Sequence, residues 1–302
     1  MSATHMPPLA EVDFTEPTTR RTLALACLHA GIDDSDAMLL RHQTNAVYLL
    51  RGAGIVAKIA RPGGELTTVS RTVSLVKWLS GQGFPTVGLS RGVPQPLFVA
   101  DSAVTFWDYL PQTAPMAAAD FAVPLRQLHR SPAPPNPLPP LNMVGAIRCS
   151  LHASRILTED QREHLLDRCD RLAARLQAVR YLFPPGLVHG DPQHRNALHT
   201  ATGPVLCDWD SARYGQLEWD LATVEIHCRR FGYPEQEYTD FARAYGLDIR
   251  EWTHFDTIRD LRELRMITTN ARKCTPGSPG AAEVVNRVQR WGRAEPHRWS
   301  IL

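Results

Sequence analysis

Short apolar runs separated by turns fill the first third of the chain. Three strand-like runs follow one another at 38–42, 46–51 and 55–60, with turn-forming residues between them. Such spacing predicts an antiparallel meander. Apolar residues at helical spacing predict helices over 18–28 and 65–80. Two more strands are expected at 87–90 and 97–109.

Helical periodicity dominates the rest of the chain. A proline-rich loop is expected at 131–141, and the turn at Thr200–Gly203 predicts a hairpin between two short apolar runs. A capping box, Thr158-Glu159-Asp160-Gln161, marks the start of one long helix. Helices are expected over 116–129, 158–181, 218–230, 235–245, 252–273 and 281–291. The pattern predicts an α+β protein with a small β-rich part, 1–110, and a larger helical part, 111–302.

Composition and charge narrow the class of protein. The 302 residues are 43% hydrophobic and 21% charged, which suits a globular chain with a sizeable core. Lys and Arg number 33 against 31 for Asp and Glu, so no electrostatic signal indicates nucleic acid or a membrane surface as partner. No apolar run reaches the roughly 18–20 residues of a membrane span. No signal peptide is recognised, and six scattered cysteines predict buried thiols in a reducing cytoplasm.

The stretch around the predicted hairpin carries the candidate chemistry. His189-Gly190-Asp191 is followed by Asn196, and Asp208 comes directly after the second strand of the hairpin. The hairpin would bring Asp191, Asn196 and Asp208 to one end. One carboxylate can orient a hydroxyl and accept its proton, while an amide oxygen and a second carboxylate hold Mg²⁺ against phosphates. The spacing therefore favours phosphoryl transfer.

His-x-Asp-x-x-x-x-Asn followed by a metal-binding Asp is the catalytic pattern of the protein-kinase-like fold. In its HGD form, with Trp219-Asp220-Leu221-Ala222 further on, the chain resembles the aminoglycoside phosphotransferase and choline kinase-like family. Weaker matches are TNAVYL from Thr44, VAKI around Lys58 and LRQLH ending at His129. The resemblance covers roughly residues 37–270 and implies a bilobal fold, with a β-sheet N-terminal lobe and a helical C-terminal lobe.

The resemblance also implies roles for single residues. Asp191 would be the catalytic base, and Asn196 and Asp208 the Mg²⁺ ligands. His189 and Asp220 would hold the catalytic loop in place without touching the substrate. The nucleotide, ATP or GTP, would be bound by Lys58 at the α- and β-phosphates, by the loop at Thr44 and Asn45, and by the backbone of Trp107, Asp108, Tyr109 and Leu110 at the adenine.

Lys58 is one of only three lysines in a chain that otherwise uses arginine. In the family a glutamate on the following helix usually pairs with this lysine, but Thr72 stands where that glutamate is expected. Glu65 is the nearest acid on the helix, about two turns away. We favour Asp208 as the partner of Lys58, because its own role places it beside the phosphates.

The acceptor is predicted only by class. The helical part is rich in arginine, which argues against a polycationic antibiotic and leaves a neutral or anionic small molecule, or a Ser or Thr hydroxyl of a peptide. Antibiotic or natural-product chemistry is suggested by analogy alone. Because this glutamate is absent, an alternative is a catalytically weak kinase-like protein that binds a nucleotide or a partner. The sequence predicts no oligomeric state.

Overall fold

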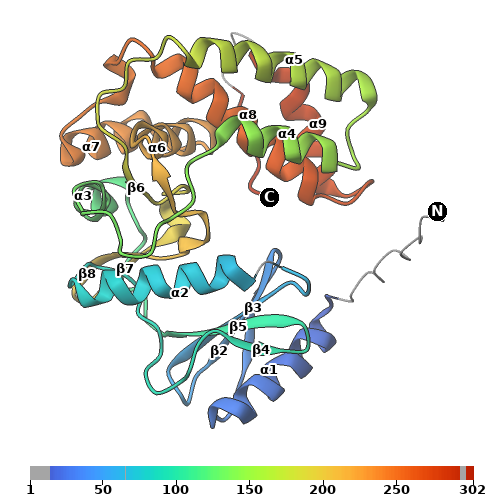
Figure 1. The fold of residues 1–302 in the computed structure, drawn as a ribbon, viewed down its shortest axis with the longest axis vertical. Helices are drawn as coiled ribbons and strands as arrows, with labels where there is room; N and C mark the ends of the chain where they lie inside the picture. Colours follow the sequence, from blue (N-terminus) through green and yellow to red (C-terminus); the bar gives the residue numbers. More distant parts are fainter. Residues whose placement is uncertain (1–13, 65, 293–296) are drawn as a thin grey trace, which may run out of the picture. The chain divides into compact units, whose positions relative to one another are not determined.

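The computed structural model describes residues 14–64, 66–292 and 297–302. The chain divides into two compact units, Met1–Pro111 and Gln112–Leu302, which are described here one at a time (Figure 1). The boundary lies one residue from the division at 110 and 111 that the sequence pattern suggests.

The first unit is built on an antiparallel sheet with the strand order β1-β2-β3-β5-β4. The strands are β1 Met38–His42, β2 Asn45–Leu50, β3 Ile55–Ala60, β4 Leu97–Val99 and β5 Ser102–Asp108. The three-strand meander is confirmed. The single strand expected over 97–109 is two strands, because the backbone turns at Ala100 and Asp101 with φ of 49° and 58°. The prediction of a strand at 87–90 is wrong, because this segment forms only an isolated bridge between Leu89 and Trp107.

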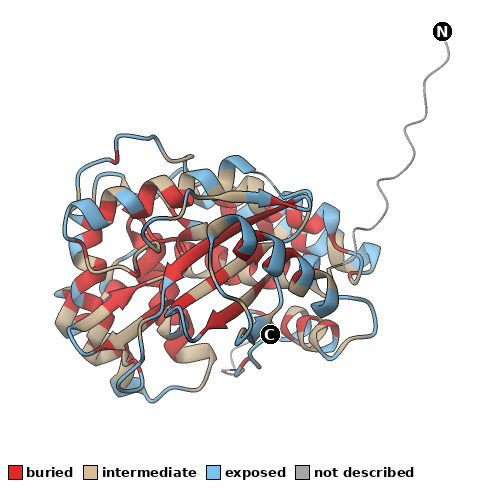
Figure 2. Ribbon diagram, turned by 90° about the horizontal axis from the view of Figure 1, so that it is seen from below, coloured by how far each residue is buried: buried red, intermediate tan, exposed pale blue. Residues whose placement is uncertain are grey.

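Two helices flank this sheet on opposite sides, α1 Glu16–Ala30 and α2 Leu66–Gly81 (Figure 1). Residues of β3 alternate between buried and partly buried positions, as expected for a strand with one face in the core. Ala57 and Ile59 belong to a core cluster with Leu23 and Cys27 of α1. Figure 2 colours the buried residues red. Lys58 therefore lies on the other face of β3.

The second unit is mainly helical, and its long helix α8 packs against α4, α5, α6 and α9. Its helices are α3 Ala118–His129, α4 Met143–Ala153, α5 Glu159–Leu176, α6 Glu218–Arg230, α7 Glu235–Tyr245, α8 Phe255–Lys273 and α9 Pro279–Arg290. Helices α6 and α7 have the predicted bounds. The expected capping box begins α5, since Thr158 Oγ1 accepts from the Gln161 amide at 3.3 Å.

Some helix predictions need correction. Helix α5 ends five residues before Tyr181, and α8 starts at Phe255 because a separate 3-10 turn, Ile249–Glu251, precedes it. Helix α4 was not predicted. It begins after Asn142, whose Oδ1 accepts from the Gly145 amide at 2.9 Å, so an N-cap at the end of the proline-rich segment was the available signal.

Two small antiparallel pairs complete the second unit. Strands β7 Ala197–Thr200 and β8 Gly203–Leu206 form the predicted hairpin, while β6 Gly186–Val188 pairs with β9 Arg213–Gly215. Short 3-10 turns lie beside these strands at His194–Asn196 and Trp209–Ser211. The pairs hold the segment 189–196 and the segment that follows β8 next to each other.

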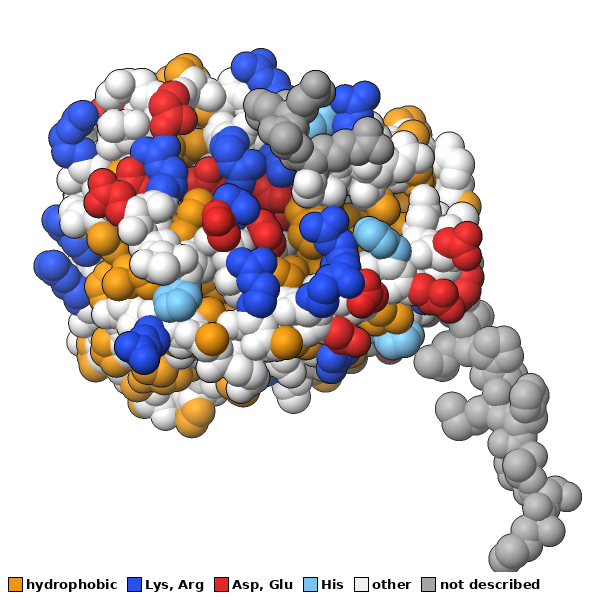
Figure 3. Space-filling model, turned by 90° about the horizontal axis from the view of Figure 1, so that it is seen from above, with side chains coloured by type: hydrophobic (Ala, Val, Ile, Leu, Met, Phe, Trp, Pro, Cys, Tyr) orange, Lys and Arg blue, Asp and Glu red, His pale blue; other side chains and the backbone are white. Residues whose placement is uncertain are grey.

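Positive and negative side chains are interspersed on the face drawn in Figure 3, in keeping with the near-balance of charge along the chain. Within the described residues, no helix has the length and apolar character needed to cross a membrane. All six cysteines are free thiols. Cys27, Cys169 and Cys228 are buried as expected, whereas Cys149 is exposed, so the prediction of buried thiols is wrong for that residue.

Candidate active site

The segment His189-Gly190-Asp191, here called the catalytic loop, is anchored by one buried carboxylate. Asp220, in the first turn of α6, accepts hydrogen bonds from the amide of His189 at 2.7 Å and from the amide of Gly190 at 2.8 Å. His129 Nε2 at the end of α3 lies 3.1 Å from the same carboxylate. The predicted bracing role of Asp220 is confirmed in these contacts, which fix the backbone just before Asp191.

Gly190 is needed for this backbone geometry. Its φ is 84°, a left-handed conformation that favours glycine, and a Cβ built there would lie 2.2 Å from the carbonyl oxygen of Ser211. The loop thus crosses the segment after β8 at a distance that only glycine permits. Trp219 Nε1 donates to the carbonyl of Gly190 at 3.3 Å and closes the contact from the other side.

His189 connects the catalytic loop to the end of β8. Its Nε2 lies 2.9 Å from the carbonyl oxygen of Cys207, and its ring lies 4.8 Å from the ring of Trp209. The side chain is fully buried. The prediction of a structural role for His189 is confirmed by this hydrogen bond, which holds the residue next to Asp208 in place.

Both carboxylate oxygens of Asp191 are hydrogen-bonded. Oδ1 accepts from Arg262 Nη2 at 2.7 Å, while Oδ2 accepts from Gln193 Nε2 at 2.9 Å and from Asn196 Nδ2 at 3.1 Å. About a third of the side chain, 32%, remains exposed. Asp191 is therefore held in one orientation and still open to solvent.

Opposing effects act on the pKa of Asp191. Burial raises the pKa, and the positive charge of Arg262 lowers it, with smaller lowering effects from His227 and Gln193. The net effect places the pKa below the usual value. Asp191 is accordingly a carboxylate at neutral pH, able to accept a hydrogen bond from a hydroxyl group.

Asn196 and Asp208 lie at the predicted end of the β7–β8 hairpin. The amide of Cys207 donates to the carbonyl of Asn196 at 2.9 Å, which brings Asn196 beside the residue before Asp208. Asp208 has a left-handed backbone, with φ 63° and ψ 61°. Since Asn196 uses Nδ2 on Asp191, its Oδ1 is the atom available as a ligand. An amide oxygen and a carboxylate are the hard donors that suit Mg²⁺ bound together with phosphates.

In the described part of the chain, no three His, Cys, Asp or Glu side chains group into a metal site of their own.

Arg262 was not assigned to the site from the sequence. It lies on α8 with a side chain only 8% exposed, and its Nε donates to Thr223 Oγ1 at 2.7 Å. Its guanidinium also lies 5.2 Å from the centre of the Trp219 ring. No acid stands three or four residues from Arg262 along α8, whereas Arg259 has Asp256 at that spacing. That contrast was the signal that Arg262 pairs outside its own helix.

In the first unit, Lys58 lies on β3 opposite Val47 of β2 and Thr105 of β5. Thr44 is exposed in the turn before β2, and Asn45 opens β2 opposite Ala60. Thr72 is buried in α2 with 6% exposed, so the position expected for a glutamate carries a neutral, buried side chain. Glu65 lies outside the described residues.

The backbone at the end of β5 has fewer amide donors available than the sequence suggested. The amide of Asp108 donates to the carbonyl of Gly88, and the amide of Tyr109 donates to that of Gly54, both at 2.9 Å. Trp107 is largely buried, and its Nε1 donates to Thr105 Oγ1 at 2.8 Å. Among the described residues no acceptor is bonded to the amide of Leu110. Within the described residues, the Leu110 amide is therefore the backbone donor that remains for an adenine contact.

The fold and site together define a kinase-like protein, and comparison with known proteins agrees. A microcompartment-associated aminopropanol kinase superposes with a TM-score of 0.68 at 18% identity, over 90% of this chain and 94% of its own. An amicoumacin kinase solved with AMP-PNP and Ca²⁺ gives 0.67 at 16% identity, over 91% and 95%. An aminoglycoside phosphotransferase from Streptomyces rimosus gives 0.60 at 21% identity, over 79% and 98%.

The family follows from a separate comparison. The family model described as the phosphotransferase enzyme family, APH, matches residues 38–261. The chain belongs to this family and is an enzyme of the phosphotransferase class. The comparison with curated proteins gives no match. The matched range includes β1 to β9 and the catalytic loop, and it stops one residue before Arg262.

Proposed function

We propose that the protein is a Mg²⁺-dependent phosphotransferase that moves the γ-phosphate of ATP, or of GTP, to the hydroxyl group of a small molecule. The observation that carries this proposal is the carboxylate of Asp191, held by three hydrogen bonds in a loop that a buried Asp220 anchors. The family assignment supports the same class of reaction.

Asp191 orients the acceptor hydroxyl and takes up its proton as the acceptor oxygen forms a bond to the γ-phosphorus and the bond to the leaving diphosphate breaks. A low pKa does not disqualify Asp191, because transfer of a phosphoryl group depends more on positioning than on a strong base. Asn196 and Asp208 would hold Mg²⁺. When bound, the ion supplies positive charge beside the β- and γ-phosphates.

The first unit, Met1–Pro111, would bind the nucleotide. Lys58 is proposed to reach the α- and β-phosphates, Thr44 and Asn45 to cover them, and the Leu110 amide to contact the base. The amicoumacin kinase was solved with AMP-PNP and Ca²⁺, which supports the use of a nucleotide and a divalent cation in this fold. The second unit, Gln112–Leu302, would carry the acceptor, and we expect the protein in the cytoplasm.

A second candidate function rests on Thr72. A buried threonine where the family usually has a glutamate favours a protein that binds nucleotide and transfers phosphate slowly or not at all. Hydrolysis of ATP with Mg²⁺ separates the two candidates, because water can replace an unidentified acceptor.

The test measures phosphate release and transfer to a panel of hydroxyl compounds and serine peptides, for wild type and Asp191→Asn. We expect Mg²⁺-dependent turnover that falls about 10²–10⁴-fold in Asp191→Asn, because the amide cannot accept the proton. Circular dichroism of the variant should match wild type. Nucleotide binding without any turnover would favour the second candidate, and equal turnover in both proteins would remove Asp191 from the mechanism.

A further inference from the structure

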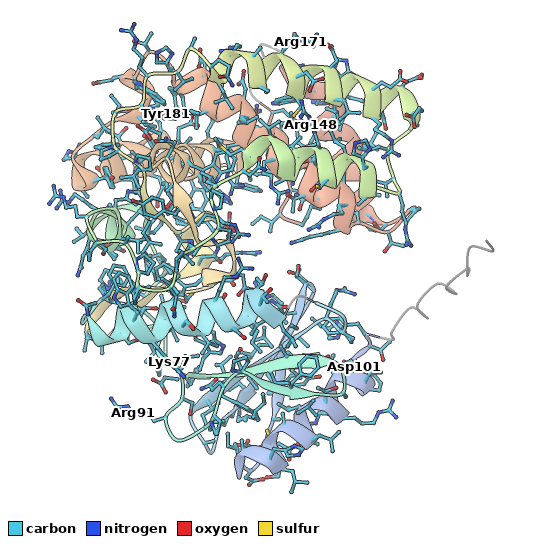
Figure 4. All side chains as sticks on the ribbon, in the orientation of Figure 1. Lys77, Arg91, Asp101, Arg148, Arg171 and Tyr181 are labelled. Atoms are coloured by element: carbon cyan, nitrogen blue, oxygen red, sulfur yellow. The ribbon has the colours of Figure 1, made fainter. Side chains whose placement is uncertain are left out.

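Several arginines of the second unit are paired with carboxylates. Arg229 and Arg230 share Glu263, with contacts of 2.9 and 2.7 Å, and Arg259 pairs with Asp260 at 2.8 Å. Arg148 on α4 bonds Asp170 at 2.6 Å, and Arg171 on α5 pairs with Asp167. Figure 4 labels Arg148 and Arg171 on these helices. The positive charges of these arginines are neutralised by carboxylates of the same unit.

Three cations in the C-terminal half of α8 have no carboxylate partner within the described part of the chain. Among the residues that the structure describes, no carboxylate lies within 4.0 Å of Arg265, Arg272 or Lys273. Arg265 Nη1 donates instead to two hydroxyl groups, Ser150 Oγ of α4 at 3.0 Å and Thr269 Oγ1. Together these residues are called the α8 cation cluster.

The α8 cation cluster begins beside the catalytic carboxylate. Arg262, which donates to Asp191 at 2.7 Å, stands one helical turn before Arg265. Burial lowers the pKa of both Arg265 and Lys273, and the negative charge of Asp191 opposes this shift at both residues, as Asp208 does at Lys273. A group bound by the cluster would therefore lie next to the position of a hydroxyl at Asp191.

The cations of the cluster repel one another. Burial lowers the pKa of Arg265 to about 10, helped by the positive charges of Arg262 and Arg272. Surrounding protein and Arg272 also lower the pKa of Lys273, although this residue keeps access to solvent. Arg213 adds to the repulsion on Arg265 from β9, where it pairs with Val188 just before the catalytic loop. An anion would relieve this repulsion.

Acidic side chains of the neighbouring helices are already paired with arginine or histidine side chains. Glu225 accepts from Arg229 at 2.7 Å, Glu263 accepts from Arg230 at 2.7 Å, and Glu237 lies 2.8 Å from His194 Nε2. His227, on α6 one turn after Thr223, stays neutral because burial lowers its pKa to about 4. On these helices the groups that interact with Asp191 are cationic or neutral, which does not suit an amine acceptor.

We propose that the α8 cation cluster binds an anionic group of the acceptor, a carboxylate or a phosphate, while the acceptor hydroxyl lies at Asp191. This inference rests on the proposed phosphotransferase function and specifies its substrate class. Arginine and lysine side chains without a carboxylate partner can form charge-assisted hydrogen bonds to such a group. The acceptor is then a hydroxylated acid or a phosphorylated alcohol, in contrast to polycationic acceptors.

Anion binding can be measured without knowing the acceptor. The full-length protein is saturated with ADP and Mg²⁺ and titrated calorimetrically with inorganic phosphate, with citrate and with spermine. The variants are Arg265→Gln/Lys273→Met and a control, Arg259→Gln, which removes a paired arginine from the same helix. Tighter binding of citrate or of phosphate identifies which anion the cluster prefers.

We expect wild type and the control to bind an anion alike, and the double variant to bind it about tenfold or more weakly. An unchanged dissociation constant in the double variant, or tighter binding of spermine than of either anion, would overturn the proposal. A parallel loss of ADP affinity would assign these cations to the nucleotide and also overturn it. Failure of ADP to bind wild type would count against the proposed function instead. In that case, the same titrations without nucleotide would still show whether the site binds anions or the cation spermine more tightly.

Discussion

Arg262 Nη2 donates to Oδ1 of Asp191 at 2.7 Å, and the arginine side chain that does so is only 8% exposed. The proposed catalytic carboxylate is thus paired with a buried positive charge before any substrate binds. The pair fixes the direction in which Asp191 accepts a hydrogen bond and keeps it ionised. It also makes the pH dependence of turnover a direct probe of Arg262.

Replacing Arg262 should shift the acid limb of the pH profile. Arg262 lowers the pKa of Asp191, so Arg262→Gln removes that effect and the pKa rises toward or above its ordinary value. We expect the acid limb of kcat/KM to move to higher pH, with a smaller effect at neutral pH. Arg259→Gln, on the same helix, should leave the limb where it is in wild type. Coincident profiles for Arg262→Gln and wild type would show that this ion pair does not control the proton acceptor.

Asp208→Ala should weaken the response to Mg²⁺. The substitution removes a carboxylate beside the proposed phosphate site, and we expect the apparent Mg²⁺ affinity to fall by about tenfold or more. Asn196→Ala should have a smaller effect, because it removes a neutral donor. Magnesium titrations of ATP turnover give both values, with Asp210→Asn as the neighbouring control. The metal assignment fails if Asp208→Ala and wild type reach half-activity at the same Mg²⁺ concentration.

Lys58→Ala should cost far more activity than Glu65→Ala. Lys58 is proposed to contact the phosphates, and loss of such a contact lowers kcat/KM by about a hundredfold. With Thr72 buried and neutral, we expect Asp208 rather than Glu65 to balance the charge of Lys58. Kinetics of the two single variants decide the point. Equal losses would mean that Glu65 serves as the missing glutamate.

Asp220→Asn should destabilise the second unit. The carboxylate is fully buried and accepts from two amides of the catalytic loop, and an asparagine would turn an NH₂ group toward at least one of these donors. We expect a loss of about 3 kcal/mol in the free energy of unfolding, measured by urea denaturation. Asp160→Asn, at the exposed start of α5, should change stability by less than about 0.5 kcal/mol. A loss no larger than that of the control would remove the anchoring role.

Local signals in the sequence were sufficient for much of the fold and for part of the site. The turn at Thr200–Gly203 predicted the β7–β8 hairpin, and with it the approach of Asn196 to the residue before Asp208. The contact of Arg262 with Asp191 spans 71 positions and depends on how α8 packs against α6. Periodicity along one helix carries no information about such a partner.

The backbone hydrogen bonds of the proposed adenine segment and the presence of α4 were not predicted from the sequence. The resemblance placed adenine contacts along Trp107–Leu110, but the pairing of Asp108 with Gly88 and of Tyr109 with Gly54 depends on loop conformations that composition does not specify. Helix α4 was missed because a glycine in its first turn and the prolines before it weaken the helical pattern.

The carboxylate of Asp220 has a consequence for exchange of backbone hydrogens with solvent. The amides of His189 and Gly190 are bonded to an acceptor with no solvent exposure, inside the helix start of α6. Their hydrogens can be replaced by deuterium only when α6 separates from the catalytic loop, which requires a large opening of the second unit. These two amides should exchange among the slowest in that unit, so deuterium uptake at the loop would report on global unfolding rather than on local motion at the proposed active site.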